Sequence, residues 1–350
     1  MNPKYTNKSW LLERIERLIH APMNYLDDHY FMIAAIGKQG APAFLKASER
    51  LQNNREFIHN VIHHTTVDIF EYVNHLYEND RETIQYILER NPRMLKFVSP
   101  KFRDDVALVS IALQSDPYVL EYASDRLKND LELVKKATKI QPHALQFASE
   151  DVRDNEAFIR DIIITYGNIL KYLSKRLQSN RAIVMMAVKT CGESLGYASH
   201  QLQDDATIVA AAIKNNAFAL GYASPRLQDN KTIVTKAITR NGRALEYASF
   251  RLRNNRDMVL MAVKNEGISL QYAASDLHDD TDIVLQAIDN DANALQYASD
   301  RFRDNRMIGL GVCYSYTWMI KYLSPRLQND FEIIRLSKRM IFDEGFMGCQ

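Results

Sequence analysis

Cysteine is scarce in this sequence, and its three copies, Cys191, Cys313 and Cys349, lie far apart. An odd number of cysteines without a Cys-x-x-Cys pair argues against a disulfide framework and against a structural zinc site. Glycine and proline are also few, at 12 and 9 of 350 residues. No glycine-rich segment has the spacing of a phosphate-binding loop, so nucleotide chemistry of that kind is not expected.

Neither sign of charge dominates, because 44 lysines and arginines balance 43 aspartates and glutamates for a net charge of +1. This balance argues against nucleic acid or an anionic membrane surface as the partner. No stretch approaches the roughly 18 apolar residues of a membrane-spanning helix. Residues 1–8 contain no apolar run of signal-peptide length. We therefore expect a cytosolic chain that binds neither nucleic acid nor membrane.

A ten-residue phrase, Gly-Tyr-Ala-Ser-Pro-Arg-Leu-Gln-Asp-Asn at 221–230, recurs with small changes through nearly the whole chain. Its aromatic column begins at Lys46 and then steps by 25 residues from Tyr72 to Tyr322. A unit this short cannot bury its apolar face alone, whereas a stack of such units can. We therefore expect an all-α fold, a solenoid of about twelve 25-residue helical hairpins.

Each repeat is predicted to contain two short helices. The first carries Leu-x-Tyr-Ala-Ser and a later leucine, as in Leu245, Tyr247 and Leu252, and the second carries an apolar stripe such as that of residues 233–238. Stacked aromatic side chains could serve as platforms for nucleic-acid bases. Because Tyr and Phe alternate in this column between apolar neighbours, we instead expect core rings with hydroxyls at the core margin.

The ends of the helices carry recognisable signals. A pair drawn mostly from Asp and Asn precedes each second helix, as at Asp229 and Asn230, and an acid often stands three residues after the first member. This is capping-box spacing, so the first member is predicted to be the N-cap. At the return turn, some copies are predicted to place glycine in left-handed backbone and others to begin the next helix with proline. The glycines are Gly192, Gly242 and Gly267, and the prolines are Pro92, Pro117 and Pro142.

The regular repeat is flanked by two different segments. Residues 1–43 are predicted to hold a capping helix, at Ser9–Ile19, and a partial repeat. Tandem repeats are expected over 44–330, and residues 331–350 are expected to close the last repeat. The apolar residues of this closing segment are Ile341, Phe342, Phe346 and Met347.

The phrase Leu-x-Tyr-Ala-Ser-x-Arg-Leu-x-Asp-Asn, followed by Ile-Val-x-x-Ala-Val, resembles a short bacterial α-helical repeat known as a domain of unknown function. The resemblance covers about residues 44–338. Such repeats are common in effector-like proteins of intracellular bacteria that infect amoebae. The resemblance therefore implies an α-solenoid and a secreted effector acting inside a host cell, and it supplies no catalytic residues.

A column of arginines runs through the repeats. A row of guanidinium groups could hold an acidic partner. It could instead pair with the nearby Asp and Asn residues of adjacent repeats, which we favour, while keeping Arg226 and Arg251 as candidates for partner binding. The column contains Arg126, Arg176, Arg226, Arg251, Arg301 and Arg326.

The repeat pattern breaks at a few aromatic residues. They occupy turn positions that are polar in other copies, such as Lys214 and Asn216. Exposed Trp and Tyr side chains are typical anchors of protein interfaces. The alternative is that the later cluster packs against the closing segment. The candidates are Tyr314, Tyr316, Trp318 and, six repeats earlier, Tyr166.

No residue pattern indicates a catalytic or metal centre. His59, His63 and His64 are near one another, but no third ligand or catalytic glutamate accompanies them, so we expect exposed histidines, no metal and no cofactor. We therefore expect a non-enzymatic protein-protein interaction scaffold that binds a protein or an extended peptide. The alternative is an effector enzyme with a site in the irregular first or last repeats. Nucleic-acid binding is a third alternative, which the charge balance disfavours.

Overall fold

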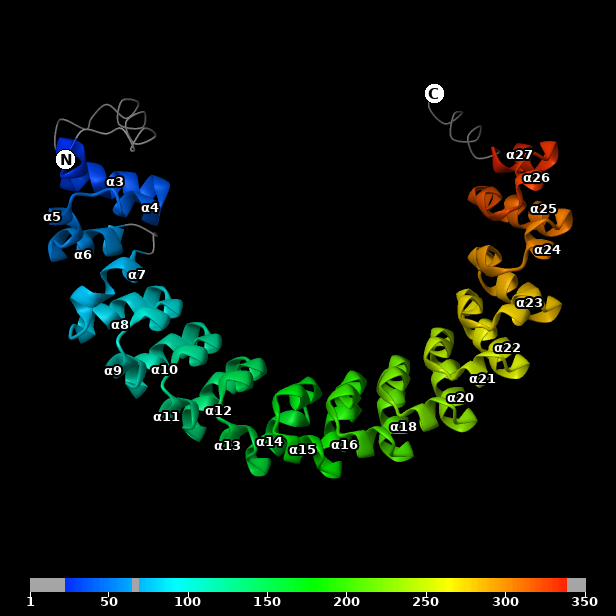
Figure 1. The fold of residues 1–350 in the computed structure, drawn as a ribbon, viewed down its shortest axis with the longest axis horizontal. Coiled ribbons are helices and arrows are strands. Elements are labelled where there is room, and N and C mark those ends of the chain that lie inside the picture. Colours follow the sequence, from blue (N-terminus) through cyan, green and yellow to red (C-terminus); the bar gives the residue numbers. More distant parts are fainter. Residues whose placement is uncertain (1–22, 65–68, 339–350) are drawn as a thin grey trace, which may run out of the picture. The chain divides into compact units, whose positions relative to one another are not determined.

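The computed structural model describes residues 23–64 and 69–338, which are helical and contain no strand. The expected all-α repeat fold is confirmed (Figure 1). The chain divides into two compact units, residues 1–153 and 154–350, each of which is a stack of helical repeats. The predicted capping helix at Ser9–Ile19 and the apolar residues Ile341, Phe342, Phe346 and Met347 lie outside the described residues.

The N-terminal part of the first unit is less regular than the rest. Its α3 helix begins after Asp28, whose side chain accepts a hydrogen bond from the backbone N–H of Phe31. The elements of this part are α2 (Met23–Leu26), α3 (His29–Gln39), α4 (Ala41–Phe44), α5 (Glu49–Gln52), α6 (Arg55–His64), α7 (Phe70–Val73) and η3 (Asn74–Tyr77).

From residue 81 onward, three kinds of helix recur in order: a long α-helix, a 3₁₀-helix and a short helix. The long helices are α8 (Arg81–Arg90), α10 (Val106–Ser115) and α12 (Leu131–Ile140) in the first unit, and α14 (Glu156–Ile163), α16 (Arg181–Thr190), α18 (Ala206–Asn215), α20 (Lys231–Arg240), α22 (Arg256–Asn265), α23 (Thr281–Asn290), α25 (Arg306–Ser315) and α27 (Phe331–Ser337) in the second.

The 3₁₀-helices are η4 (Pro92–Phe97), η5 (Pro117–Tyr122) and η6 (Pro142–Phe147) in the first unit, and η7 (Gly167–Tyr172), η8 (Gly192–Tyr197), η9 (Ala217–Tyr222), η10 (Gly242–Tyr247), η11 (Gly267–Tyr272), η13 (Ala292–Tyr297) and η14 (Thr317–Tyr322) in the second. The short helices are α9 (Pro100–Arg103), α11 (Asp125–Lys128) and α13 (Glu150–Arg153), then α15 (Lys175–Gln178), α17 (His200–Gln203), α19 (Pro225–Gln228), α21 (Phe250–Arg253), η12 (Ser275–Asp279), α24 (Asp300–Arg303) and α26 (Pro325–Gln328).

The repeat is therefore not a simple two-helix hairpin, and that prediction is wrong in detail. The expected first helix is broken in two at the Ala-Ser step. Ser249 has extended backbone (φ −55°, ψ 156°), and its hydroxyl accepts a hydrogen bond from the N–H of Leu252. Serine is a strong N-cap residue, so it ends η10 and begins α21 at the same point.

The predicted N-cap position is also wrong by one residue. The second member of each Asp/Asn pair caps the long helix: Asp205 accepts hydrogen bonds from the N–H groups of Thr207 and Ile208, and Asn230 accepts one from Ile233. The first member, such as Asp229, is instead the C-cap of the preceding short helix. Only two residues link the helices, so one residue ends the first helix and the other begins the second.

The glycines of the return turn were predicted to adopt left-handed backbone, and this prediction is wrong. Among the described residues, only Gly40 has a positive φ. Gly192, Gly242 and Gly267 are instead the first residues of 3₁₀-helices, the position that Pro92 occupies in η4. At these three glycines the next repeat approaches more closely than a side chain allows, since a Cβ on Gly267 would lie 2.2 Å from the carbonyl oxygen of Ala287.

The core runs along the stack between the rows of helices. Leu245 and Leu252 are completely buried, as are Val234 and Ile238, as the apolar pattern predicted. Successive long helices contact one another, as α16, α18 and α20 do, and successive 3₁₀-helices do the same. Full burial of one such aliphatic side chain stabilises the fold by about 1.5–3 kcal/mol. Each repeat therefore obtains much of its stability from its neighbours.

The aromatic column does not lie in the core, contrary to expectation. Its rings are half-buried or exposed in every described copy, and Tyr197 and Tyr222 are 47% and 45% exposed. Each ring is at the C-terminal end of its 3₁₀-helix, two residues after the leucine that fills the core. The column therefore forms part of the surface of each stack.

Replacing Gly267 with alanine tests the close approach between repeats. We expect Gly267→Ala to destabilise the protein by about 1–3 kcal/mol, because the new Cβ forces η11 away from α23. Urea unfolding followed by circular dichroism measures the change. The control is Gly311→Ala in α25, where no atom lies within 4 Å of the new Cβ. Better helix propensity should stabilise that variant by about 0.5–1 kcal/mol. Equal effects of the two changes would contradict this account.

Candidate functional site

The arginines of the repeated phrase reach back to the preceding repeat. The Nε atom of Arg226 donates to the two carboxylate oxygens of Asp204 over 3.0 and 3.1 Å, and Nη2 donates to the Asp204 backbone carbonyl over 2.8 Å. The hydroxyl of Ser224 donates to the same carboxylate and accepts from the N–H of Leu227. We call such a set of Asp, Ser and Arg the inter-repeat clasp.

The clasp recurs with constant geometry. Serine follows the aspartate by 20 residues and arginine follows it by 22 in all sets except the first. The sets are Asp27–Ser48–Arg50, Asp104–Ser124–Arg126, Asp154–Ser174–Arg176, Asp204–Ser224–Arg226, Asp229–Ser249–Arg251, Asp279–Ser299–Arg301 and Asp304–Ser324–Arg326.

Aspartate and arginine occur together in these positions. Where the aspartate is replaced, the residue 22 positions later is not arginine. The replaced pairs are Asn79 with Lys101, Asn129 with Asp151, Ser179 with Gln201 and Asn254 with Asp276. The matching can be seen in the sequence when residues 22 positions apart are compared, but not in the arginine column alone. The aspartate and the arginine of a clasp are therefore either both present or both replaced.

The ion pairs of Arg226 and Arg251 support the structural interpretation of the arginine column. Both guanidinium groups bind an aspartate of the preceding repeat, Asp204 and Asp229 respectively. Their side chains are nevertheless 63% and 65% exposed. A role for these two arginines in partner binding stays a prediction, and any partner would meet a guanidinium that is already paired.

A second row of ion pairs links the long helices. Arg256, the first residue of α22, donates to Asp280, which caps α23 in the next repeat. This hydrogen bond lowers the pKa of the Asp280 carboxyl. Equivalent pairs join Arg81 to Asp105 and Arg181 to Asp205. Many of the charges near the Asp/Asn pairs are therefore neutralised within the stack.

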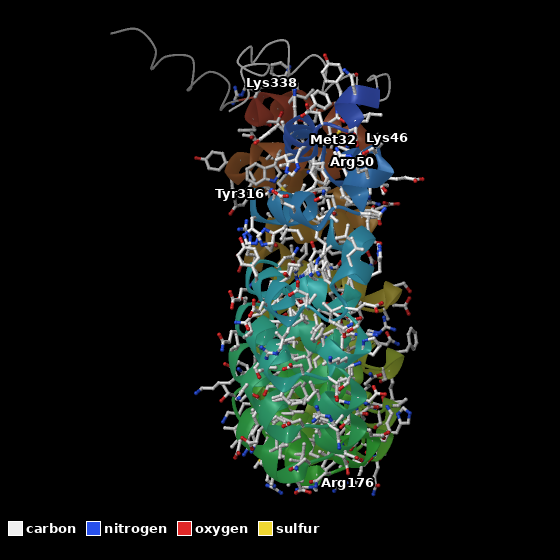
Figure 2. All side chains as sticks on the ribbon, turned by 90° about the vertical axis from the view of Figure 1, so that its left-hand side faces the viewer. Met32, Lys46, Arg50, Arg176, Tyr316 and Lys338 are labelled. Atoms are coloured by element: carbon white, nitrogen blue, oxygen red, sulfur yellow. The ribbon has the colours of Figure 1, made fainter. Side chains whose placement is uncertain are left out.

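The structure brings together the aromatic residues that break the pattern near the C-terminal end. Tyr314 lies in the last turn of α25, Tyr316 directly precedes η14, and Trp318 lies in η14. They are 65%, 44% and 49% exposed. The ring centroids of Tyr316 and Trp318 are 5.2 Å apart. Figure 2 places Tyr316 at the surface of the molecule. We call these three residues the aromatic cluster.

Tyr316 and Tyr166 occupy the N-cap position of a 3₁₀-helix. At this position Asp116, Asn216 and Asn241 accept a hydrogen bond from the N–H group two residues later. Neither tyrosine makes a side-chain capping bond. A capping bond is typically worth about 1 kcal/mol. At both positions an exposed ring stands where a small polar side chain would cap the helix better. Tyr316 is flanked by Tyr314 and Trp318, whereas Tyr166 has no aromatic residue at the corresponding positions 164 and 168.

Two histidines of α6, His59 and His63, lie in an aromatic stack. The ring of His63 is 3.9 Å from that of His59 and 3.8 Å from that of Tyr86, measured between centroids. Among the residues that the structure describes, no three His, Cys, Asp or Glu side chains are grouped so that they could hold a metal ion. Within the same residues, no helix has both the length and the apolar character that crossing a membrane requires.

Comparison with known proteins identifies the repeat but assigns no activity. A family described as "Domain of unknown function (DUF4116)" matches residues 105–153, 155–203, 205–253, 230–278 and 255–303, which together are more than half of the chain. Each match is about 49 residues long and spans two successive copies of the three-helix unit. No curated protein and no solved structure matches the chain.

Restoring the missing cap tests the unusual position of Tyr316. We expect Tyr316→Asn to stabilise the protein by about 0.5–1 kcal/mol, because asparagine caps the equivalent helices η9 and η10. Urea unfolding measures the change. Tyr314→Asn is the matched control, since it removes an exposed ring at a position that caps no helix. If the two variants are equally stable, the capping argument is wrong.

The clasps predict a particular dependence of stability on pH. The hydroxyl of Ser249 and the guanidinium of Arg251 lower the pKa of Asp229 below its ordinary value of 3.8, and Ser224 and Arg226 do the same for Asp204. A lowered folded-state pKa stabilises the fold above the unfolded-state value, and this stabilisation is lost as the pH falls through the folded-state value.

The test compares wild type with the double variant Asp204→Asn, Asp229→Asn. At pH 7 wild type should have the higher urea midpoint, and the difference should shrink as the pH falls below about 4. A control variant, Asp257→Asn, changes an acid that belongs to no clasp and should leave the pH profile unchanged. A difference in midpoint that is the same at pH 7 and pH 3 would contradict the role of the clasp carboxylates.

Proposed function

The chain belongs to the DUF4116 family of helical repeats, and we propose that it is a non-enzymatic scaffold that binds another protein. The observation that carries this proposal is the aromatic cluster. Three large aromatic side chains within five residues are all exposed, and one of them replaces a helix cap. Trp and Tyr are the residues most enriched among binding hot spots.

The position of the cluster suits recognition. Tyr314, Tyr316 and Trp318 lie on a turn that α25 and η14 hold on both sides, and the clasp of Asp304, Ser324 and Arg326 joins this repeat to the next. A turn held in this way loses little conformational freedom when it binds. Each ring also combines apolar area with a polar tip, as is common at interfaces that form and dissociate.

The finer part of the proposal concerns the partner and the location. We propose that the partner is a protein or an extended peptide of a host cell, and that the chain reaches it as a secreted bacterial effector. The resemblance of the repeats to those of effector-like proteins supports this part. A stack whose repeats share one backbone but differ at their turns suits such a role, because side chains at the turns can change without altering the core.

Exchanging the cluster for polar residues tests the proposal. In the variant Tyr314→Lys, Tyr316→Asn, Trp318→Asn, each new residue is one that another repeat carries at the same position, so the fold should be retained. Wild type and variant, immobilised at equal density, are used to capture proteins from a eukaryotic lysate, and captured proteins are quantified by mass spectrometry. Proteins specific to wild type should fall at least about tenfold with the variant.

Two controls distinguish binding at the cluster from non-specific binding to exposed apolar side chains and from packing of the cluster against the closing segment, residues 331–350. Phe250→Ala and Met307→Ala remove apolar side chains elsewhere that are at least as exposed as the cluster, and they should leave capture unchanged. Deletion of residues 339–350 should not reduce capture. The proposal fails if the polar variant captures the same proteins as wild type. If capture rises only after the deletion, the cluster serves the chain's own closing segment instead.

A further inference from the structure

The residue that precedes the column tyrosine is unusual in two neighbouring repeats. Other copies carry Lys, Glu or Gln there, but η8 and η9 carry Gly196 and Gly221. In three of those copies a lysine covers the aromatic ring that follows it. The ammonium groups of Lys96, Lys171 and Lys321 lie 4.2, 4.7 and 4.7 Å from the ring centroids of Phe97, Tyr172 and Tyr322.

Glycine leaves the following ring without such a cover. This explains why Tyr197 and Tyr222 are the most exposed tyrosines of the column. Glycine also lets the next repeat come close, since a Cβ on Gly196 would lie 2.8 Å from the ring of Tyr222. The result is two tyrosine rings on adjacent helices with a glycine between them.

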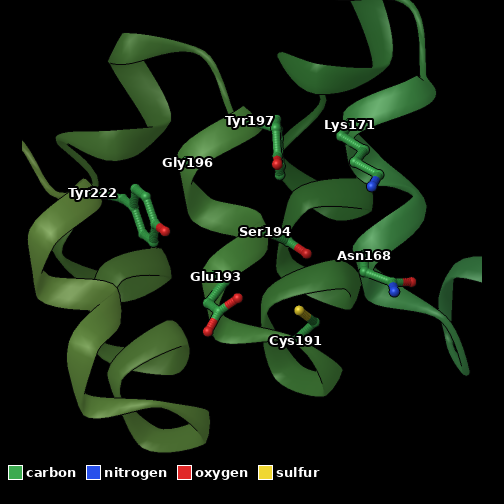
Figure 3. A pocket seen from close by; sticks show the side chains of 8 residues that line it. All are labelled: Asn168, Lys171, Cys191, Glu193, Ser194, Gly196, Tyr197 and Tyr222. Carbon is green, nitrogen blue, oxygen red and sulfur yellow. The ribbon is translucent and has the colours of Figure 1, made fainter.

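A hollow of about 340 Å³ opens at this place, entirely within the second unit. Figure 3 shows Tyr222 and Tyr197 on either side of Gly196, with Glu193 below them. Tyr197 lies between Tyr222 and Lys171 in the same view. Glu193, Lys171 and the two tyrosines all line the hollow.

The charges of the hollow favour a cation between the rings. From residue 81 onward, Glu193 is the only acid in its column of the sequence. It accepts a hydrogen bond from the Nδ2 atom of Asn216 over 3.1 Å and forms no ion pair within the described part of the chain. The ammonium of Lys171 is placed over the ring of Tyr172, on its own helix. An anion would meet Glu193, whereas a cation would meet a carboxylate and two tyrosine side chains.

We propose that this hollow binds a cationic side chain, arginine or lysine, of an extended peptide. A cation within about 6 Å of an aromatic centroid gains roughly 0.5–2 kcal/mol, and the planar guanidinium of arginine stacks well on such rings. The volume suits one long side chain, because pockets for small ligands begin at about 300 Å³. The proposal does not depend on the aromatic cluster, which lies in other repeats and offers no acid.

The probes are acetyl-Gly-Arg-Gly-amide, acetyl-Gly-Lys-Gly-amide and the citrulline peptide acetyl-Gly-Cit-Gly-amide, each titrated into the full chain and followed by ligand-observed NMR. Citrulline has nearly the shape of arginine without its charge. We expect at least one cationic peptide to bind about tenfold more tightly than the citrulline peptide. Equal binding of all three, or no binding of any, overturns the proposal.

Matched variants assign the binding to the hollow. Gly196→Gln should fill the hollow and abolish binding. Other repeats already carry glutamine at this position, as Gln146 and Gln271. Glu246→Gln, at the equivalent position before Tyr247, does not line the hollow and should leave binding intact. Glu193→Gln, a change at an exposed position, should weaken binding of the cationic peptides about tenfold and leave the citrulline peptide unaffected. Binding that survives both Gly196→Gln and Glu193→Gln overturns the proposal.

Discussion

The hydrogen-bonded contact between successive repeats, completed by the clasp in many of them, is the interaction on which the rest of this structure depends. A six-residue 3₁₀-helix and a four-residue α-helix are too short to be stable alone, because forming a first helical turn is unfavourable. Where it is present, the clasp ties a short helix to the repeat before it. The backbone N–H of Ser224 donates to the carbonyl of Gln203 over 2.9 Å, the Ser224 hydroxyl donates to Asp204, and Arg226 completes the contact. One surface ion pair contributes little, but here each pair also orients a backbone hydrogen bond and a helix cap.

The sequence predicts the class of fold well because the period and the aliphatic pattern are both strong. Burial of Leu245, Leu252 and Ile238 follows from that pattern. The break at Ser249 could not be predicted from the same pattern, because a leucine spacing compatible with one helix is also compatible with two helices joined at a cap. The tyrosine column was misplaced because tyrosine suits both a core margin and a surface. The small size of Gly267 depends on Ala287, which is close only after the repeats have stacked.

The candidate sites were predictable only in part, and for a related reason. Tyr314, Tyr316 and Trp318 were visible as deviations from a polar column. The clasps required comparison of residues 22 positions apart, and the hollow required the absence of a side chain at Gly196. The two proposed recognition sites depart from the repeat in opposite ways, since one adds aromatic rings at a turn and the other removes a long polar side chain. The cluster lies beside an intact clasp, Asp304–Ser324–Arg326, whereas Ser179 and Gln201 replace the clasp pair at the hollow. Neither site uses a clasp residue, so the contacts that hold the stack are separate from those available for binding.

Amide hydrogen exchange of two variants tests this separation most directly. Exchange is followed by mass spectrometry in wild type, in Arg226→Gln and in Trp318→Ala. The account predicts that loss of Arg226 accelerates exchange in α19 and in the adjoining residues 199–205, because a clasp has been opened. Loss of Trp318 should leave exchange outside its own turn unchanged, because the ring is half exposed and belongs to no clasp. Unchanged exchange in α19 after loss of Arg226, or widespread acceleration after loss of Trp318, would contradict the account.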